Sequence, residues 1–291
     1  MPQPSRRALL GLGAAAAVAA LSACAPPVVT LPSLAATPGS TPAPTPAATQ
    51  TTVEAPHPEP AVVEPVEAAP PPPQSPPSLA KVPAPNGTIT ALPGDGSLLA
   101  WTVDDGTSTE VIAAYAGFAA ASGIRLTMFV TGTYLAWDRN VGTLAPLIAT
   151  GQVQLGNHTW SHPDLTKLDD ASIAGELQRN HDFIADLFGV DARPFFRPPY
   201  GSHDARVDAI AADLGYTVPT LWYGSLSDSA EIPAQQICEL ARQWFLPQHI
   251  VIGHLNFPPV TTVFDDLRAT ILERGLTTVT LNDVFSSPYH P

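Results

Sequence analysis

Seven short apolar runs alternate with longer helical patterns in the C-terminal part of the chain. The runs cover residues 98–103, 126–130, 152–156, 194–196, 217–221, 249–253 and 276–280. The helical patterns between them cover residues 108–122, 140–150, 169–188, 204–214, 233–244 and 261–274. Strands that alternate with helices form right-handed β-α-β units, in which the strands lie parallel. We therefore predict an α/β domain built on a parallel sheet.

The number of predicted strands limits the possible α/β architectures. Seven strands within residues 97–291 favour a small, distorted (β/α) barrel over two separate domains, with a doubly wound open sheet as the alternative. Ser108 and Ser202 precede helical patterns and are predicted N-caps. In both folds the chemistry gathers at the carboxyl ends of the strands.

A shift in composition separates this domain from what precedes it. Residues 25–85 contain 19 prolines, and no Lys or Arg occurs between Arg7 and Lys81. Such a segment cannot bury enough apolar surface to offset its chain entropy, and its proline runs favour stiff polyproline II structure. We predict a disordered linker over residues 25–96, followed by a globular domain over residues 97–291.

Residues 1–24 have the pattern of an export signal. Arg6 and Arg7 form a twin-arginine-like start, and the apolar stretch 11–21 is too short to span a membrane as a helix. Small residues then precede Cys24, as they do where bacterial lipoproteins are cleaved and lipidated. We predict a domain that is lipid-anchored through Cys24 to the outer face of the bacterial cytoplasmic membrane. A conventional signal peptide with a chance cysteine, and export by the general secretory route, are the alternatives.

Charge and cysteine content limit the partners. The formal net charge of −13 argues against nucleic acid and anionic lipid headgroups, so membrane attachment would be through the lipid alone. The chain has two cysteines, and with Cys24 lipidated Cys238 is left without a disulfide partner. Cys238 is predicted to be a buried, unreactive thiol in the 233–244 helix. Nothing in the sequence implies an obligate protein partner.

Polar side chains follow five of the seven predicted strands. In chain order they are Asp104 and Asp105, His158 and His162, Arg197 and Tyr200, Trp222 and Asp228, and finally His254. The carboxyl ends of parallel strands meet at one edge of a sheet, so we expect these side chains to form a single site.

His158 and His162 are the first candidates for metal ligands. Their i, i+4 spacing lets both imidazoles reach one ion if the segment takes a helical turn, although such pairs taken alone are more often surface or capping residues. A carboxylate from Asp104 or Asp105 would complete a two-His, one-carboxylate face that leaves positions open for water and substrate.

The second aspartate is a candidate general base. The spacer between the two histidines contains no Glu, which excludes the zinc-protease pattern in which that Glu is the base. A bound cation would also relieve the repulsion between Asp104 and Asp105. The alternative for Asp104-Asp105-Gly106 is a plain Asp-Gly turn.

The remaining strand ends offer groups for orientation, oxyanion binding and proton transfer. The planar guanidinium of Arg197 suits an ionised carboxylate, and two prolines rigidify the turn before Tyr200, whose backbone N–H is a candidate oxyanion donor. His254 is a candidate general acid, and Trp222 is a stacking surface for substrate. An exposed arginine, a packing tyrosine and a structural histidine are the alternatives.

Together these blocks resemble the polysaccharide deacetylases, the NodB-homology domain of family 4 carbohydrate esterases. The matching blocks are Thr102-Val103-Asp104-Asp105-Gly106, His158-Thr159-Trp160-Ser161-His162, Arg197-Pro198-Pro199-Tyr200 and Ile252-Gly253-His254. The resemblance spans about residues 97–285 and implies a distorted (β/α) barrel with fewer than eight repeats. The family also has an Asp shortly before a Trp, which tunes the acid. Here Asp228 has no Trp after it, and Leu255 stands where the family often has Asp.

The resemblance implies a role for each of these residues. The metal, zinc or alternatively cobalt, would be bound by Asp105, His158 and His162. The residues that act on the substrate would be the base Asp104, oriented by Arg197, the acid His254, tuned by Asp228, and the oxyanion donor Tyr200.

The expected function is metal-dependent removal of N- or O-acetyl groups from a cell-envelope or extracellular polysaccharide. Peptidoglycan, chitooligosaccharide and acetylxylan are the candidate substrates. One alternative is a carbohydrate-binding envelope lipoprotein with a degenerate site, suggested by the incomplete Asp-Trp block. Another is a non-haem iron oxygenase, which the second aspartate and the barrel-like strand order fit poorly.

Overall fold

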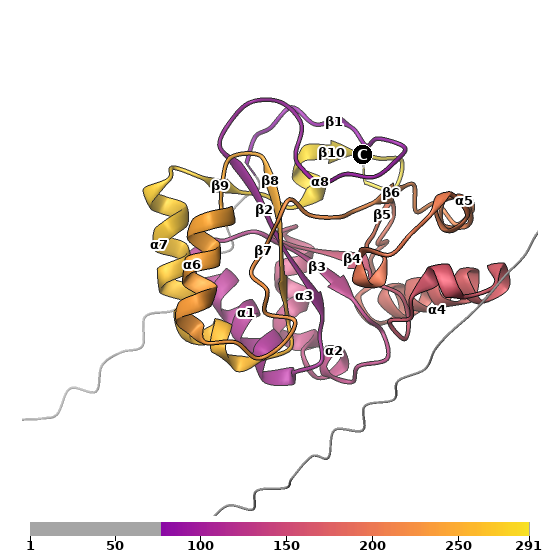
Figure 1. Cartoon of the computed structure of the whole chain (residues 1–291), viewed down its shortest axis with the longest axis horizontal. Coiled ribbons are helices and arrows are strands. Elements are labelled where there is room, and N and C mark those ends of the chain that lie inside the picture. The colour runs from indigo at the N-terminus through magenta and orange to yellow at the C-terminus, as the bar shows by residue number, and fades with distance from the viewer. Residues whose placement is uncertain (1–76, 291) are drawn as a thin grey trace, which may run out of the picture. The chain divides into compact units, whose positions relative to one another are not determined.

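Parallel strands curl around a common interior to form the framework of the domain (Figure 1). The computed structural model describes residues 77–290, so the predicted signal peptide, Cys24 and most of the predicted linker lie outside the described residues. The sheet has the order β6-β5-β4-β3-β2-β8-β7, and β9 pairs with the start of β2. No helix within residues 77–290 has the length and apolar character that crossing a membrane requires.

The strands follow the predicted order closely. They are β2 (Leu98–Asp105), β3 (Leu126–Val130), β4 (Val153–Asn157), β5 (Phe195–Phe196), β6 (Val218–Pro219), β7 (Gly224–Ser225), β8 (His249–His254) and β9 (Thr277–Thr278). All seven predicted strands are present, and the two-residue β7 is an addition. Since every pairing in this sheet is parallel and the sheet curls, the predicted distorted (β/α) barrel is confirmed.

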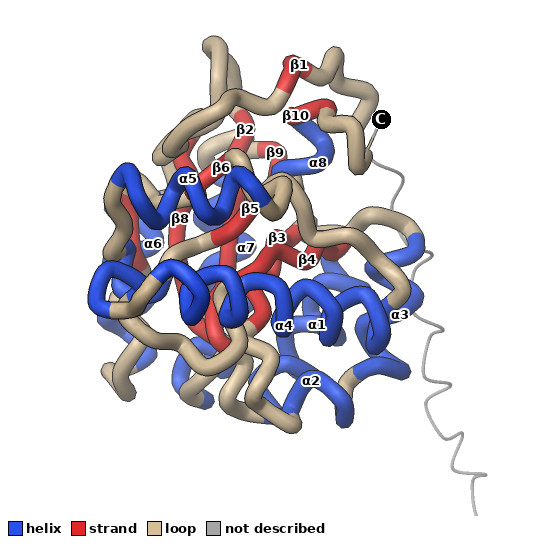
Figure 2. Tube along the Cα trace, turned by 90° about the vertical axis from the view of Figure 1, so that its right-hand side faces the viewer, coloured by secondary structure: helices blue, strands red, loops and turns tan. Residues whose placement is uncertain are grey.

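Helices pack around the outside of the curled sheet (Figure 2). They are α1 (Thr109–Ser122), α2 (Ala136–Arg139), α3 (Val141–Ala149), α4 (Asp170–Phe188), α5 (Ala205–Asp213), α6 (Ala234–Trp244) and α7 (Phe264–Glu273). The short α8 (Leu281–Val284) lies instead beside the strand pair β1 (Val82–Pro83) and β10 (Phe285–Ser286). Cys238 is buried in α6, and burial raises the pKa of its thiol, as expected for an unreactive cysteine.

The alternation of side chains along β2 explains why the site lies inside the barrel. Leu99, Trp101 and Val103 belong to the core between sheet and helices, whereas Ala100 belongs to the core of the barrel interior. Successive side chains of a strand point to opposite faces. Asp104 therefore shares the inward face of β2 with Ala100.

The N-terminal part of the domain begins earlier than predicted. Ile89 and Leu92 are buried in the interior core, although both fall in the predicted linker 25–96. The N–H of Ile89 donates to Pro219 O at 2.9 Å, and the N–H of Leu92 donates to Gln248 O at 2.8 Å. The linker therefore ends before these residues, and its predicted boundary was wrong because the flanking prolines and glycines hide two core residues.

One predicted N-cap is confirmed and the other is wrong. The Ser108 hydroxyl accepts a hydrogen bond from the N–H of Val111 at the start of α1. Helix α5 is capped by Asp204 instead of Ser202, since the Asp204 carboxylate accepts from the N–H groups of Arg206 and Val207. Ser202 ends the preceding 3₁₀ turn, η2 (Pro199–Gly201), which delays the helix start.

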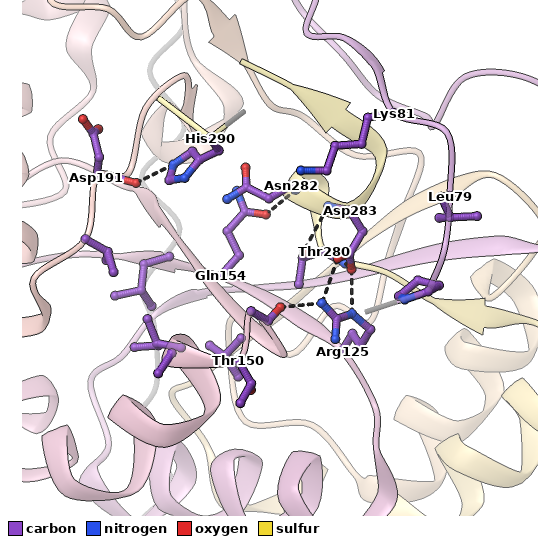
Figure 3. A pocket seen from close by; sticks show the side chains of 17 residues that line it. Leu79, Lys81, Arg125, Thr150, Gln154, Asp191, Thr280, Asn282, Asp283 and His290 are labelled. Carbon is purple, nitrogen blue, oxygen red and sulfur yellow. Dashed lines mark hydrogen bonds and ion pairs between the residues drawn. The ribbon is translucent and has the colours of Figure 1, made fainter. Parts of the chain in front are cut away.

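A buried ion pair anchors the C-terminal segment beside a cavity remote from the predicted site residues (Figure 3). Arg125 donates through Nε and Nη2 to the Asp283 carboxylate at 2.6 and 2.7 Å. Asp283 also accepts from the N–H of Thr280 in the capping box of α8. Both charged groups are therefore committed to holding α8 against the start of β3.

Gly156 offers a test of the packing inside the barrel. A Cβ at this position would lie 2.5 Å from the ring of buried Phe129, so Gly156→Ala should lower the free energy of unfolding by about 1–3 kcal/mol. Gly175→Ala is the matched control, because this exposed position in α4 has open space and should gain about 0.5–1 kcal/mol. Urea unfolding measures both, and equal stability of the Gly156 variant and the parent would contradict the packing described.

Candidate metal centre and active site

Asp105, His158 and His162 converge on one point at the carboxyl ends of β2 and β4. Asp105 Oδ1 lies 3.5 Å from His158 Nε2 and 3.3 Å from His162 Nε2. The potential ligand atoms all lie within 4.8 Å of one another. Asp105 Oδ1 is buried and has no hydrogen-bond partner among residues 77–290. An unpartnered carboxylate oxygen facing two imidazole nitrogens fits a divalent cation, and this donor set suits zinc.

The backbone of Asp105 explains how two adjacent aspartates reach the same site. Neighbouring strand residues normally point to opposite faces. Asp105 has φ 72°, which breaks this alternation, and Gly106 follows with φ 92°. The indole N–H of Trp137 donates to Asp105 O at 3.0 Å, and a Cβ on Gly106 would lie 2.4 Å from the same indole. Gly106 is therefore required both by its positive φ and by the packing of Trp137.

The segment that carries the two histidines is an irregular loop. The helical turn, which was only one way for the i, i+4 spacing to bring the two rings together, does not form, since Thr159 and His162 have φ of 69° and 61°. The N–H of His162 donates to Thr159 Oγ1, and the N–H of Thr159 donates to Asn157 Oδ1 at 2.9 Å. The buried amide of Asn180 in α4 also donates to Asn157 Oδ1, at 2.8 Å. The two imidazoles are thus brought together by side-chain hydrogen bonds within the loop and to α4, and not by a turn of helix.

His158 is oriented by the backbone of Arg197. The His158 Nδ1 lies 2.7 Å from Arg197 O, which accepts the Nδ1–H hydrogen bond. This contact leaves Nε2 as the ring nitrogen that faces Asp105, the arrangement expected of a metal-binding histidine.

Arg197 and Asp104 form a buried ion pair next to these ligands. Arg197 Nη1 donates to Asp104 Oδ1 at 2.6 Å, and the two residues are 0% and 1% exposed. Arg197 also donates from Nη1 to Thr102 Oγ1 at 2.9 Å and from Nε to Thr220 O at 2.8 Å. Burial lowers the pKa of Arg197, and the charge of Asp104 opposes that shift. Arg197 is therefore not a surface arginine, and it leaves Asp104 Oδ2 facing the His158 ring at 3.5 Å.

His254 lies beside Asp104 at the carboxyl end of β8 and is held by Asp228. His254 Nδ1 lies 3.0 Å from Asp228 Oδ1, and the backbone N–H of His254 donates to Asp228 Oδ2 at 3.2 Å. Burial lowers the pKa of His254, but the hydrogen bond to Asp228 and the charge of Asp104 outweigh burial, so the pKa is raised. Asp228 makes this contact without the Trp that the family pattern places after it.

A cavity of about 530 Å³ joins these groups. Its lining comprises Asp104, Asp105, His158, His162, Pro198, Tyr200, Trp222, Ser225, Ser229, Ile252 and His254. The Tyr200 side chain is 71% exposed at the mouth, with its ring 4.7 Å from that of His162, so it is not a core-packing aromatic. Trp222 lies close to Gly201 and its ring faces the Arg197 guanidinium at 5.7 Å. The fold thus brings together all the site residues predicted within residues 77–290.

Sequence reasoning missed residues that support the site. Thr102 lies two positions before Asp104 on the same strand face, so the strand period is a signal that points to it. Asn256 lies two positions after His254, and its amide donates to Asp105 Oδ2 at 2.7 Å. Asn180 lies in the middle of α4, where only its position among buried apolar residues marks it.

Comparisons with known proteins agree with this architecture. Residues 92–219 match the family model described as polysaccharide deacetylase. Chitin deacetylase 1 of Cryptococcus neoformans is 49% identical over 69 residues, which cover 24% of this chain and 14% of that protein. The chain spans less than two thirds of the length of the curated relatives it matches.

Solved structures share the fold. A family 4 carbohydrate esterase pseudoenzyme from Bacillus anthracis is 19% identical with a TM-score of 0.62, over 70% of both chains. A peptidoglycan N-acetylglucosamine deacetylase is 20% identical with a TM-score of 0.63, over 71% of this chain and 95% of its own. At these identities the likeness shows the fold alone. Residues 92–219 thus match the polysaccharide deacetylase family model, and the domain that contains them shares its fold with solved family 4 carbohydrate esterases.

Proposed function

We propose that this domain is a metal-dependent deacetylase that hydrolyses N- or O-acetyl groups of an acetylated polysaccharide. One observation carries the proposal: the Asp105, His158 and His162 cluster shares a cavity with an aspartate held by Arg197 and a histidine held by Asp228. These are the groups that hydrolysis of an acyl bond needs, namely an electrophile site, a base and an acid.

The proposed cofactor is zinc, with cobalt as the alternative, because both accept two imidazoles and a carboxylate. The unpartnered, buried Asp105 Oδ1 and the orientation of His158 support a cation at this position. When bound by Asp105, His158 and His162, the cation would polarise the acetyl carbonyl and lower the pKa of a water molecule.

Two side chains of this domain, Asp104 and His254, then carry out the two proton transfers. Asp104, oriented by Arg197, takes a proton from the attacking water on its Oδ2. The backbone N–H of Tyr200 stabilises the oxyanion that forms at the acetyl carbonyl. His254 donates a proton to the departing amine or alcohol as its bond to the acetyl carbon breaks. The products are acetate and the deacetylated sugar.

The substrate class follows from the cavity and from the relatives. The exposed ring of Tyr200 and the ring of Trp222 at the cavity offer flat surfaces for a pyranose. Relatives are named for chitin and peptidoglycan N-acetylglucosamine, so acetylated amino sugars of the cell envelope are the first candidates. The contact between His254 and Asp228 weakens the alternative of a degenerate, binding-only site, because the acid does have its carboxylate.

Acetate release is the direct test. The purified full chain with zinc should release acetate from chitooligosaccharides, peptidoglycan fragments or acetylxylan, and a chelator should reduce the rate to background. Asp104→Asn should lower kcat by about 10²–10⁴-fold, the usual contribution of a positioned general base. Asp191→Asn is the control, since Asp191 pairs with Arg193 outside the cavity and its loss should leave kcat unchanged. Parent-like release by Asp104→Asn would refute the assigned base.

The role of Asp228 predicts a change in pH dependence. Asp228 raises the pKa of His254, so Asp228→Asn should lower that pKa and move the alkaline limb of the kcat/KM profile to lower pH. Asp208→Asn serves as the control, because Asp208 contacts His203 outside the cavity and should not move either limb. An alkaline limb at the same pH in Asp228→Asn and parent would contradict the assignment of His254 as the acid.

We also propose that the domain is exported and lipid-anchored through Cys24, with the proline-rich segment as a spacer. The sequence around Cys24 and the proline content support this placement. Cys24→Ser should shift the protein from the membrane fraction to the soluble fraction, because the acyl attachment site is lost. Cys238→Ser is the matched control, since Cys238 is buried in α6 and should leave the protein with the membranes. Membrane retention of Cys24→Ser would contradict the anchor.

A further inference from the structure

We infer that Asn256 is a positioning residue that restricts Asp105 to a single metal-binding oxygen. The inference rests on the proposed metal site and assigns a new role to the loop after β8. Asn256 Nδ2 donates to Asp105 Oδ2 at 2.7 Å. The other oxygen, Oδ1, is the buried one without a hydrogen-bond partner in the described part of the chain, and it faces both histidines. The amide therefore separates the two oxygens into one that is held and one that is free to bind.

Asn256 is itself held rigidly. Its Oδ1 accepts from the N–H and the hydroxyl of Thr107 at 3.3 and 3.0 Å. The backbone pairing between β2 and β8 continues past Asp105, with the N–H of Leu255 donating to Asp104 O and the N–H of Ser108 donating to Leu255 O. The loop after β8 thus runs beside residues 105–107. In one orientation the Asn256 amide both donates to Asp105 and accepts from Thr107.

The charge arrangement favours an amide at this position. Asp104 and Asp105 already place two carboxylates beside the cavity, and a neutral donor fixes Asp105 without adding a third negative charge. Loss of a hydrogen bond to a metal-binding carboxylate typically lowers metal affinity by about 10–100-fold.

Metal titration of the full chain tests the inference. Zn²⁺ affinity should fall about 10–100-fold in Asn256→Leu, which keeps the side-chain volume but removes the amide. The visible absorption of bound Co²⁺ should also change, because Asp105 Oδ2 becomes free to join the coordination. Asn282→Leu is the matched control, since the same substitution falls beside the cavity next to α8 and outside the site cavity, and its Zn²⁺ affinity and Co²⁺ spectrum should stay close to those of the parent.

Asn256→Ala is measured in parallel, because it adds no bulk, and the melting temperature of each metal-free variant reports on folding. Zn²⁺ affinity and Co²⁺ spectra like those of the parent, or failure of both Asn256 variants to fold, would overturn the inference and leave Asn256 as a structural link between loops. A parent that binds zinc but releases no acetate would instead refute the proposed function and leave this inference standing.

Discussion

The ion pair between Arg197 and Asp104 lies in the middle of the barrel, where both side chains are almost completely withdrawn from water. Withdrawing two charges from water costs several kcal/mol per ion, and the attraction between them offsets this only when their remaining hydrogen bonds are satisfied. The fold supplies those partners: Thr102 from β2 and the carbonyl oxygens of Thr220 and Leu221 after β6. The position of Asp104, the proposed general base, therefore depends on the correct closure of the barrel.

That closure involves a segment that precedes the strands of the curled sheet. Ile89 donates to Pro219 O and accepts from the N–H of Leu221, so it pairs with the chain that carries two of the Arg197 acceptors. Ile89 lies before residues 92–219, which match the family model. Ile89 thus helps to hold the chain that carries the Arg197 acceptors, and this segment contributes to the position of Asp104.

Backbone strain is concentrated at the same edge of the barrel. Six residues other than glycine have positive φ within residues 77–290, and five of them lie at the strand end, turn and loops that build the site. These five are Asp105, Thr159, His162, Tyr200 and Ser227. Such conformations cost about 1–3 kcal/mol each and persist only where the surroundings determine them, as the Trp137 indole does for Asp105. The loops are strained because they turn side chains inward where a regular strand or helix would turn them away.

The strained segments are also the ones whose structure could not be predicted from the sequence. The strand order and the convergence of strand ends follow from the alternation of strands and helices, which needs no knowledge of side-chain partners. The i, i+4 spacing of His158 and His162 did not predict how the two rings meet, because their approach depends on Asn157 and on Asn180, which is distant in sequence. The spacing of residues along the chain predicts regular helices and strands, but it does not predict the irregular loops that carry His158 and His162.

Asp228 shows the same distinction between a pattern and the physical requirement beneath it. In the sequence Asp228 lacks the Trp that the family pattern places after it. The pattern alone would therefore suggest that His254, the proposed acid, has no carboxylate partner. The acid needs a carboxylate within hydrogen-bond distance of Nδ1, and in the fold Asp228 provides it while also accepting the backbone N–H of His254. Two contacts from one carboxylate fix both the ring and the peptide of His254, at the position on β8 that pairs with Asp104 on β2. The register of these two central strands thus places the proposed acid and base side by side at the cavity, and the neighbouring loops only have to hold their side chains in place.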